Sequence, residues 1–104
     1  MFGGNFTKWR HDGLCEYVSR SARVELVSLA VSGAGSARAL ARTVGVSHVA
    51  VLKWLRFRDV HPSNANLRKI VGLAAEFDDA AVSRILKKDL QIHQECFKNF
   101  IAGD

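Results

Sequence analysis

The sequence predicts an all-α fold of five helices, and three features support this prediction. Apolar residues recur every three or four positions over most of the chain, which is the period of one face of a helix. The chain contains a single proline, so few positions oppose a helix. No alternating polar and apolar run is long enough to predict a substantial strand. At 104 residues, the chain suits one domain with an additional element.

The first predicted helix follows an irregular segment, residues 1–11, which we expect to be a flexible basic arm. Asp12 is placed as the N-cap, because its carboxylate can accept hydrogen bonds from first-turn amides. A break near residues 19–21 is an alternative that would divide this helix into two. The helix ends within 32–35, where glycine can adopt the left-handed terminal conformation. Its inner face is the series Leu14, Val18, Ala22, Leu26 and Ala30.

Two short helices are predicted next, separated by Gly45. Ser36 can cap the first of them, and Ser47 can cap the second. Apolar residues share one face of each short helix, so we expect the two helices to pack against each other. These residues are Ala37, Leu40, Ala41 and Val44 in the first helix, and Val51, Trp54 and Leu55 in the second.

Two more helices complete the prediction. Pro62 marks a boundary, because proline disfavours helical backbone in the residue before it. Ser63 or Asn64 caps the fourth helix, whose inner face is Leu67, Ile70, Val71, Ala74 and Phe77. Asp78 and Asp79 place negative charge at the start of a fifth helix, which suits the helix dipole. That long helix extends over 79–101 and carries many apolar residues.

Charge is distributed unevenly along the chain. Residues 1–58 contain nine basic and three acidic residues, a net charge of +6. Residues 59–104 contain six basic and seven acidic residues, a net charge of −1. A basic half joined to a nearly neutral half favours a polyanionic partner for the first half. The alternative is a basic protein without an anionic partner.

The segment Ala37–Arg56, "ARALARTVGVSHVAVLKWLR", resembles the helix-turn-helix of the Cro/lambda-repressor-like family of bacterial and phage repressors. Ala41 is small enough for two helices to cross closely, and Gly45 suits a turn with positive φ. The segment 62–74 resembles the next helix of that family, and the resemblance covers roughly residues 24–77. It implies a DNA-binding domain over 12–78 and binding to double-stranded DNA. A related homeodomain-like helix-turn-helix, as in recombinases, is an alternative.

The second helix of such a motif enters the major groove with its N-terminal part. Its outward side chains are therefore the predicted base-reading residues: Ser47, His48, Val49, Leu52 and Lys53. Arg56 and Arg58 lie farther along and are expected to meet phosphates. The resemblance adds further phosphate contacts, so that the predicted set is Ser36, Arg38, Arg42, Arg56, Arg58, Asn64, Asn66 and Arg68.

The C-terminal segment, residues 79–104, is predicted to form a homodimer interface. Its apolar stripe is wider than a solvated helix needs, and helix-turn-helix proteins commonly bind two half-sites as twofold dimers. Packing of this helix on the first helix of the same chain is the alternative. The predicted interface residues are Val82, Leu86, Leu90, His93, Phe97 and Phe100.

Other classes of site have little support in the sequence. The pairs His11–Cys15 and His93–Cys96 offer an alternative zinc site, and Cys15–Cys96 an alternative disulfide, but neither spacing is characteristic. No nucleotide-binding or catalytic motif is present, so we expect neither an enzyme nor a cofactor or small-molecule ligand. No run is long enough to span a membrane, and the N-terminus does not resemble a signal peptide, so a cytoplasmic protein is expected.

The sequence thus predicts a homodimeric, sequence-specific DNA-binding protein that regulates transcription as a repressor-like factor, of prokaryotic or viral type. Two alternatives stay open. One is a DNA-binding accessory protein of recombination, transposition or partition. The other is a protein-interaction module that keeps the helix-turn-helix but does not bind DNA.

Overall fold

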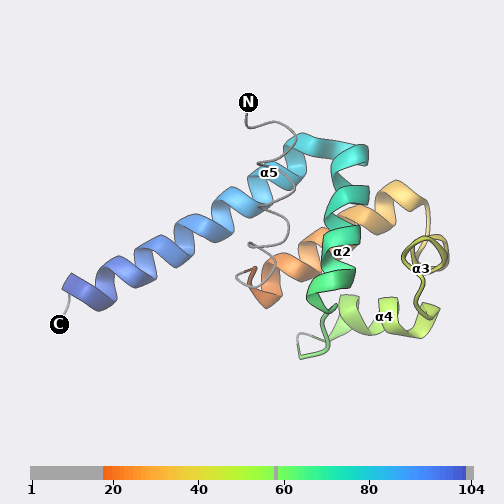
Figure 1. Cartoon of the computed structure of the whole chain (residues 1–104), viewed down its shortest axis with the longest axis horizontal. Coiled ribbons are helices and arrows are strands. Elements are labelled where there is room, and N and C mark those ends of the chain that lie inside the picture. The colour runs from red at the N-terminus through yellow and green to blue at the C-terminus, as the bar shows by residue number, and fades with distance from the viewer. Residues whose placement is uncertain (1–17, 58, 103–104) are drawn as a thin grey trace.

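The computed structural model describes residues 18–57 and 59–102, and this part of the chain contains four helices and no strand. The helices are α2 (Arg20–Ala34), α3 (Ala37–Val44), α4 (His48–Arg56) and α5 (Asn64–Ala102). Figure 1 shows α2, α3, α4 and the first half of α5 in one body, from which the second half of α5 extends. The predicted all-α class is confirmed, but the predicted number of five helices is not.

The fourth and fifth predicted helices are joined in α5, which bends at Asp78. Asp78 has non-helical backbone angles, φ −154° and ψ 86°. Its Oδ1 accepts a hydrogen bond from the Ala81 amide at 3.0 Å, which is the interaction of an N-cap. The bend therefore lies where a helix boundary was predicted. Because one residue alone leaves the helical conformation there, the two segments form a single bent element.

Serine and glycine define the other helix ends. Each helix begins after a serine whose Oγ accepts a hydrogen bond from the amide three residues later, at 3.0–3.2 Å: Ser19, Ser36, Ser47 and Ser63. Gly35 and Gly45 end α2 and α3 in the left-handed conformation, with φ of 101° and 90°. α2 begins at Arg20, within the alternative break near residues 19–21, whereas the 1–11 arm, the Asp12 cap and the rest of the chain before residue 18 lie outside the described residues.

The core is formed by the inward faces of all four helices. Every described member of the predicted inner face of the first helix is buried. The largest fully buried side chains include Leu26, Leu40, Val51, Leu67 and Ile70. The predicted helical faces are therefore confirmed over most of their length.

Phe77 is the exception, because its side chain is 52% exposed although the helical period placed it on the inner face of α5. A Cβ atom added to Gly33 in α2 would lie 2.7 Å from both Cβ and Cγ of Phe77. The backbone of α2 thus occupies the space beneath Phe77, and α5 bends at the next residue. The expectation of a buried Phe77 is wrong because the close approach of α2 and the bend leave the ring at the surface.

The second half of α5 is tied to the start of α2 by Asp89. Its Oδ2 accepts from the Ser19 amide at 2.9 Å, and its Oδ1 accepts from the Ser19 Oγ at 2.6 Å. A carboxylate at a helix N-terminus satisfies amides that have no partner within the helix. This contact fixes the direction in which the C-terminal half of α5 leaves the body.

Candidate nucleic-acid interface

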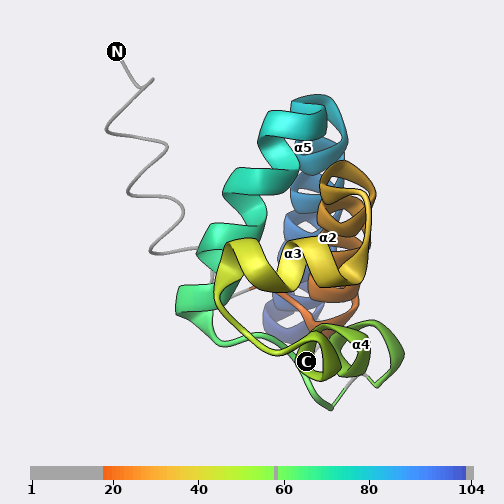
Figure 2. The ribbon, with the colours of Figure 1, turned by 90° about the vertical axis from the view of Figure 1, so that its right-hand side faces the viewer.

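α3 and α4 form the two helices of a compact helix-turn-helix unit. Figure 2 shows α3 crossing the body with α4 below it. Leu40 and Val44 of α3 and Val51 and Trp54 of α4 are all buried. Gly45 allows the tight connection, since its φ of 90° lies in the region that favours glycine. The sequence interpretation of two helices packed through a glycine turn is confirmed in its geometry.

The outward face of α4 carries all five predicted base-reading residues. Val49 is 56% exposed and Leu52 is 43% exposed. Lys53 and Ser47 are also exposed, and His48 is half-buried. Ser47 has a structural role as well, because its Oγ accepts the Ala50 amide at 3.0 Å. Its hydroxyl hydrogen is still available to a ligand.

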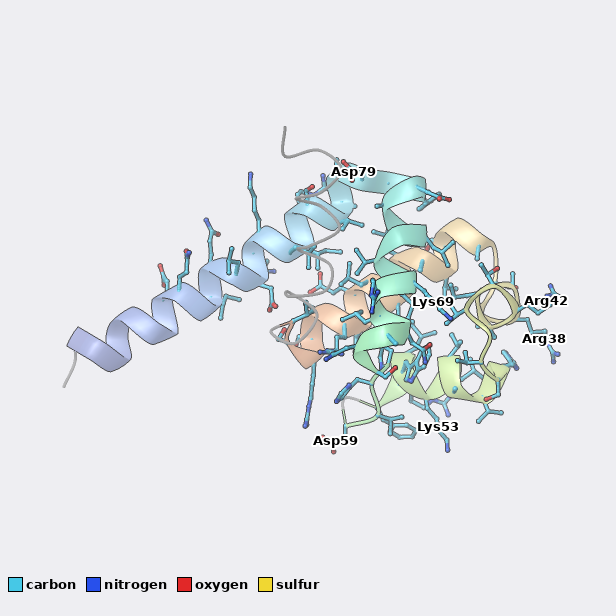
Figure 3. The ribbon with its side chains drawn as sticks, in the orientation of Figure 1. Arg38, Arg42, Lys53, Asp59, Lys69 and Asp79 are labelled. Atoms are coloured by element: carbon cyan, nitrogen blue, oxygen red, sulfur yellow. The ribbon has the colours of Figure 1, made fainter. Side chains whose placement is uncertain are left out.

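Four exposed basic side chains lie on the two helices of the unit, two on each. Arg38 and Arg42 on α3 are exposed and point away from the body, as Figure 3 shows. Lys53 and Arg56 on α4 are exposed too. Residues 36–57 contain no aspartate and no glutamate. The surface of α3 and α4 is therefore uniformly positive, which attracts a polyanion.

The remaining predicted phosphate contacts lie at the start of α3 and of α5. Ser36 is exposed, and its Oγ accepts the Ala39 amide at 3.0 Å. Asn64 is exposed, but its Oδ1 already accepts a hydrogen bond from Arg23 at 3.2 Å. Asn66 is half-buried and Arg68 is exposed. Arg58 lies outside the described residues.

Arg23 is a positioning residue that the sequence interpretation missed. It is 5% exposed. Its Nε donates to the Val18 carbonyl at 3.0 Å, and its NH1 donates to the Pro62 carbonyl at 2.9 Å. Together with the bond to Asn64, these contacts hold the α4–α5 connection against the start of α2. The burial of Arg23 could have been predicted from the sequence, because Arg23 lies four residues before the buried Val27 and so shares its face of the helix.

Lys69 is a second missed positioning residue. Its Nζ donates to the carbonyl of Val44, in the last turn of α3, at 3.3 Å. Carbonyls at a helix C-terminus have no partner in the helix, and a cation there also suits the helix dipole. Figure 3 shows Lys69 on the side of α5 that is nearer to α3. Nothing in the local sequence indicates this contact between residues 25 positions apart.

The predicted dimer residues divide into two groups along α5. Val82 is 5% exposed and belongs to the core of its own chain, which removes it from the predicted interface. Leu86 is half-buried against the same core. Leu90 is 40% exposed, and the neighbouring Ile92 is 54% exposed. His93, Phe97 and Phe100 lie on α5, but their side chains are not among those that the structure describes.

Other kinds of site have limited support in the described part of the chain. Among residues 18–57 and 59–102, no three histidine, cysteine, aspartate or glutamate side chains group to hold a metal ion. The alternative zinc and disulfide residues, His11, Cys15, His93 and Cys96, lie outside the described side chains. A surface hollow lies between α2, α3 and α5 and contains no α4 residue.

No helix in the described ranges is by itself long and apolar enough to cross a membrane, and α2 and α3 reach that length and composition only as a pair bent by 100°. Comparisons with protein-family models, with curated proteins and with solved structures find no match to this chain. The resemblance to the Cro/lambda-repressor-like family therefore stays a prediction. The functional argument depends on the surface of α3 and α4.

Proposed function

We propose that this chain is a homodimeric, sequence-specific protein that binds double-stranded DNA and regulates transcription. The observation that carries the proposal is the surface of α3 and α4. α3 and α4 together carry four exposed basic side chains and no acidic residue, and the outward face of α4 carries the predicted base-reading residues. An α-helix fits the B-DNA major groove, which is about 12 Å wide.

The two helices divide the work of binding in this proposal. The N-terminal half of α4 enters the major groove, where His48 and Lys53 meet base edges. Arg38 and Arg42 on α3, with Arg56 at the end of α4, meet phosphates on the rim of the groove. Phosphate contacts supply affinity without sequence preference, and base contacts supply the preference. Lys69 holds the last turn of α3, and Arg23 holds the connection that follows α4.

The projecting half of α5 supports the proposed homodimer. Positions 90, 93, 97 and 100 are occupied by Leu, His, Phe and Phe, at spacings of three, four and three. Alternating spacings of three and four place these residues in one seam between paired helices. A dimer also presents two copies of α4 to successive half-sites, which one copy of this small unit cannot do.

Selection of bound sequences from a random pool of DNA duplexes tests the proposal. We expect enrichment of a site with twofold symmetry, and we expect the His48→Ala/Lys53→Ala double variant to lose part of its selectivity while it still binds duplex at low salt. Ser47 is left unchanged, because its loss would also remove the N-cap of α4. Arg84→Ala, which removes an exposed charge from α5, is the matched control and should leave selectivity intact.

Two results would redirect the proposal. Absence of binding to any duplex at low salt would contradict it and favour a protein-interaction module. Selected sites found in repeated arrays or at the ends of mobile elements, rather than at promoters, would favour an accessory role in recombination, transposition or partition.

A further inference from the structure

The centre of the α4 surface is apolar. Leu52 follows Val49 by three positions, so the two side chains lie on one side of the helix. They are 56% and 43% exposed. A partner that covered both side chains would remove them from water. Each methylene group buried in this way contributes about 0.8 kcal/mol of favourable binding free energy. The two side chains lie among basic residues, since Lys53 adjoins Leu52 and Arg56 follows one turn later. A ligand for this surface must combine negative charge with an apolar group.

The same helix is poor in side chains that read bases through paired hydrogen bonds. Residues 47–56 contain no asparagine or glutamine for adenine, and Lys53 and Arg56 are the side chains in this stretch that can make a bidentate contact with guanine. Ser47 already accepts a hydrogen bond from the Ala50 amide, and His48 is half-buried. Two exposed positions of the first two turns are instead occupied by valine and leucine.

One chemical group in the major groove matches this surface. The 5-methyl group of a pyrimidine is the apolar feature that base edges present there, and it occurs in thymine and in 5-methylcytosine. Phosphates on both sides of the groove supply the negative charge that Arg38, Arg42 and Arg56 complement. A protein partner would need an acidic rim around an apolar centre, whereas duplex DNA offers this arrangement at every thymine.

We infer that α4 reads 5-methylpyrimidines, with Val49 and Leu52 as the residues that set specificity. The inference rests on the proposed function, because it requires α4 to lie in the major groove. It adds that recognition depends on methyl contact more than on hydrogen bonds. The preferred sites should therefore contain thymine at the positions opposite Val49 and Leu52.

The test replaces thymine by uracil, one position at a time, in a duplex obtained by selection. Uracil pairs as thymine does but lacks the 5-methyl group. At the contacted positions we expect affinity to fall about fourfold for each methyl group removed, which corresponds to about 0.8 kcal/mol. A second series places 5-methylcytosine or cytosine at the same positions. Methylation of cytosine should recover affinity, which separates recognition of the methyl group from recognition of thymine as a base.

Variants of the protein assign the effect to its residues. The loss of affinity caused by uracil should become smaller in Val49→Ala at one contacted position and in Leu52→Ala at another. A double-mutant cycle that pairs each protein variant with each uracil substitution measures this coupling. Val60→Ala is the matched control, because Val60 is 39% exposed but lies in the connection between α4 and α5. Its uracil effect should equal that of the unchanged protein. The substituted side chains are exposed, so thermal unfolding should change little.

The outcomes separate the inference from the function on which it rests. Selective duplex binding that is insensitive to uracil at every position would overturn the inference and leave DNA recognition standing. A uracil effect that persists in both Val49→Ala and Leu52→Ala would also overturn it. Failure to bind any duplex at low salt would overturn the proposed function and the inference together, and would identify the apolar face as a protein contact.

Discussion

Two of the surfaces that expose apolar side chains in the described part of the chain differ in charge. The first is the outward face of α4, with Val49 and Leu52. The second is the projecting part of α5, with Leu90 and Ile92. Residues 36–57 have four basic and no acidic residues, whereas residues 84–95 have three basic and two acidic residues. The exposed fractions of the apolar side chains are similar, so charge is the property that distinguishes the two surfaces.

A uniformly positive rim favours a polyanion, and a mixed rim favours a protein surface of similar composition. We therefore propose DNA as the partner of the first surface and another copy of the chain as the partner of the second. The two surfaces also differ in support, because Lys69 bonds to the last turn of α3 and Arg23 bonds to the connection after α4, while the end of α5 projects from the body (Figure 1). If this comparison is right, changes to one surface should leave the function of the other intact.

The largest effect is expected from a charge in the predicted dimer seam. Leu90→Glu would bury an unpaired carboxylate from each chain, at a cost of about 3 kcal/mol or more, which is over a hundredfold in the dimer dissociation constant. Sedimentation equilibrium should report a monomer, and circular dichroism should report unchanged helix content. Gln91→Glu adds the same charge to an exposed neighbour and should leave the dimer intact. A dimer that survives Leu90→Glu would move the interface away from this surface.

Removal of two positive charges from α3 should have the next largest effect. If Arg38 and Arg42 each contact a phosphate, the double alanine variant should lower the slope of log affinity against log salt by about 1.8. The variant would then lose roughly tenfold less affinity than the unchanged protein between 50 and 200 mM salt. Lys87→Ala/Lys88→Ala removes the same charge from exposed positions of α5. Equal slopes for the two double variants would contradict the division of the molecule into two surfaces.

The smallest effect is expected at the contact that anchors the projecting helix. Asp89→Asn keeps one oxygen acceptor for Ser19 but loses the charge and the second acceptor. Hydrogen bonds to charged groups are worth about 1.5–3 kcal/mol, so the free energy of unfolding should fall by about 1 kcal/mol. Denaturant unfolding would measure this change, and Glu95→Gln, at an exposed position of the same helix, is the control. A loss no greater than that of the control would show that the Ser19 contact is unimportant for stability.

The helix-turn-helix unit was predictable to within a residue or two because its limits depend on local chemistry. A serine before an apolar series caps a helix wherever the chain goes next, and glycine is the residue that adopts positive φ without strain. The inward faces of α3 and α4 follow from the helical period alone. The outward face of α4 then follows by exclusion. These rules place Ser47, Val49, Leu52 and Lys53 on the candidate site.

The errors arise where segments distant in sequence approach each other. Phe77 has the spacing of a core residue, but the backbone at Gly33 fills the space that it would occupy. Val82 has the spacing of a dimer contact, but it is buried within its own chain. In both cases the helical period gives the direction of a side chain around its helix. It does not indicate what lies in that direction.

The sequence by itself therefore determined the all-α class, the helix ends, and the acid-free surface of α3 and α4, because each depends on composition or on contacts within a few residues. The tertiary structure decided which charged groups hold the helices together. Asp89 meets Ser19 across 70 residues, and Arg23 meets Pro62 across 39 residues. Such contacts form only after hydrophobic burial has brought the helices together, so no local pattern of residues encodes them.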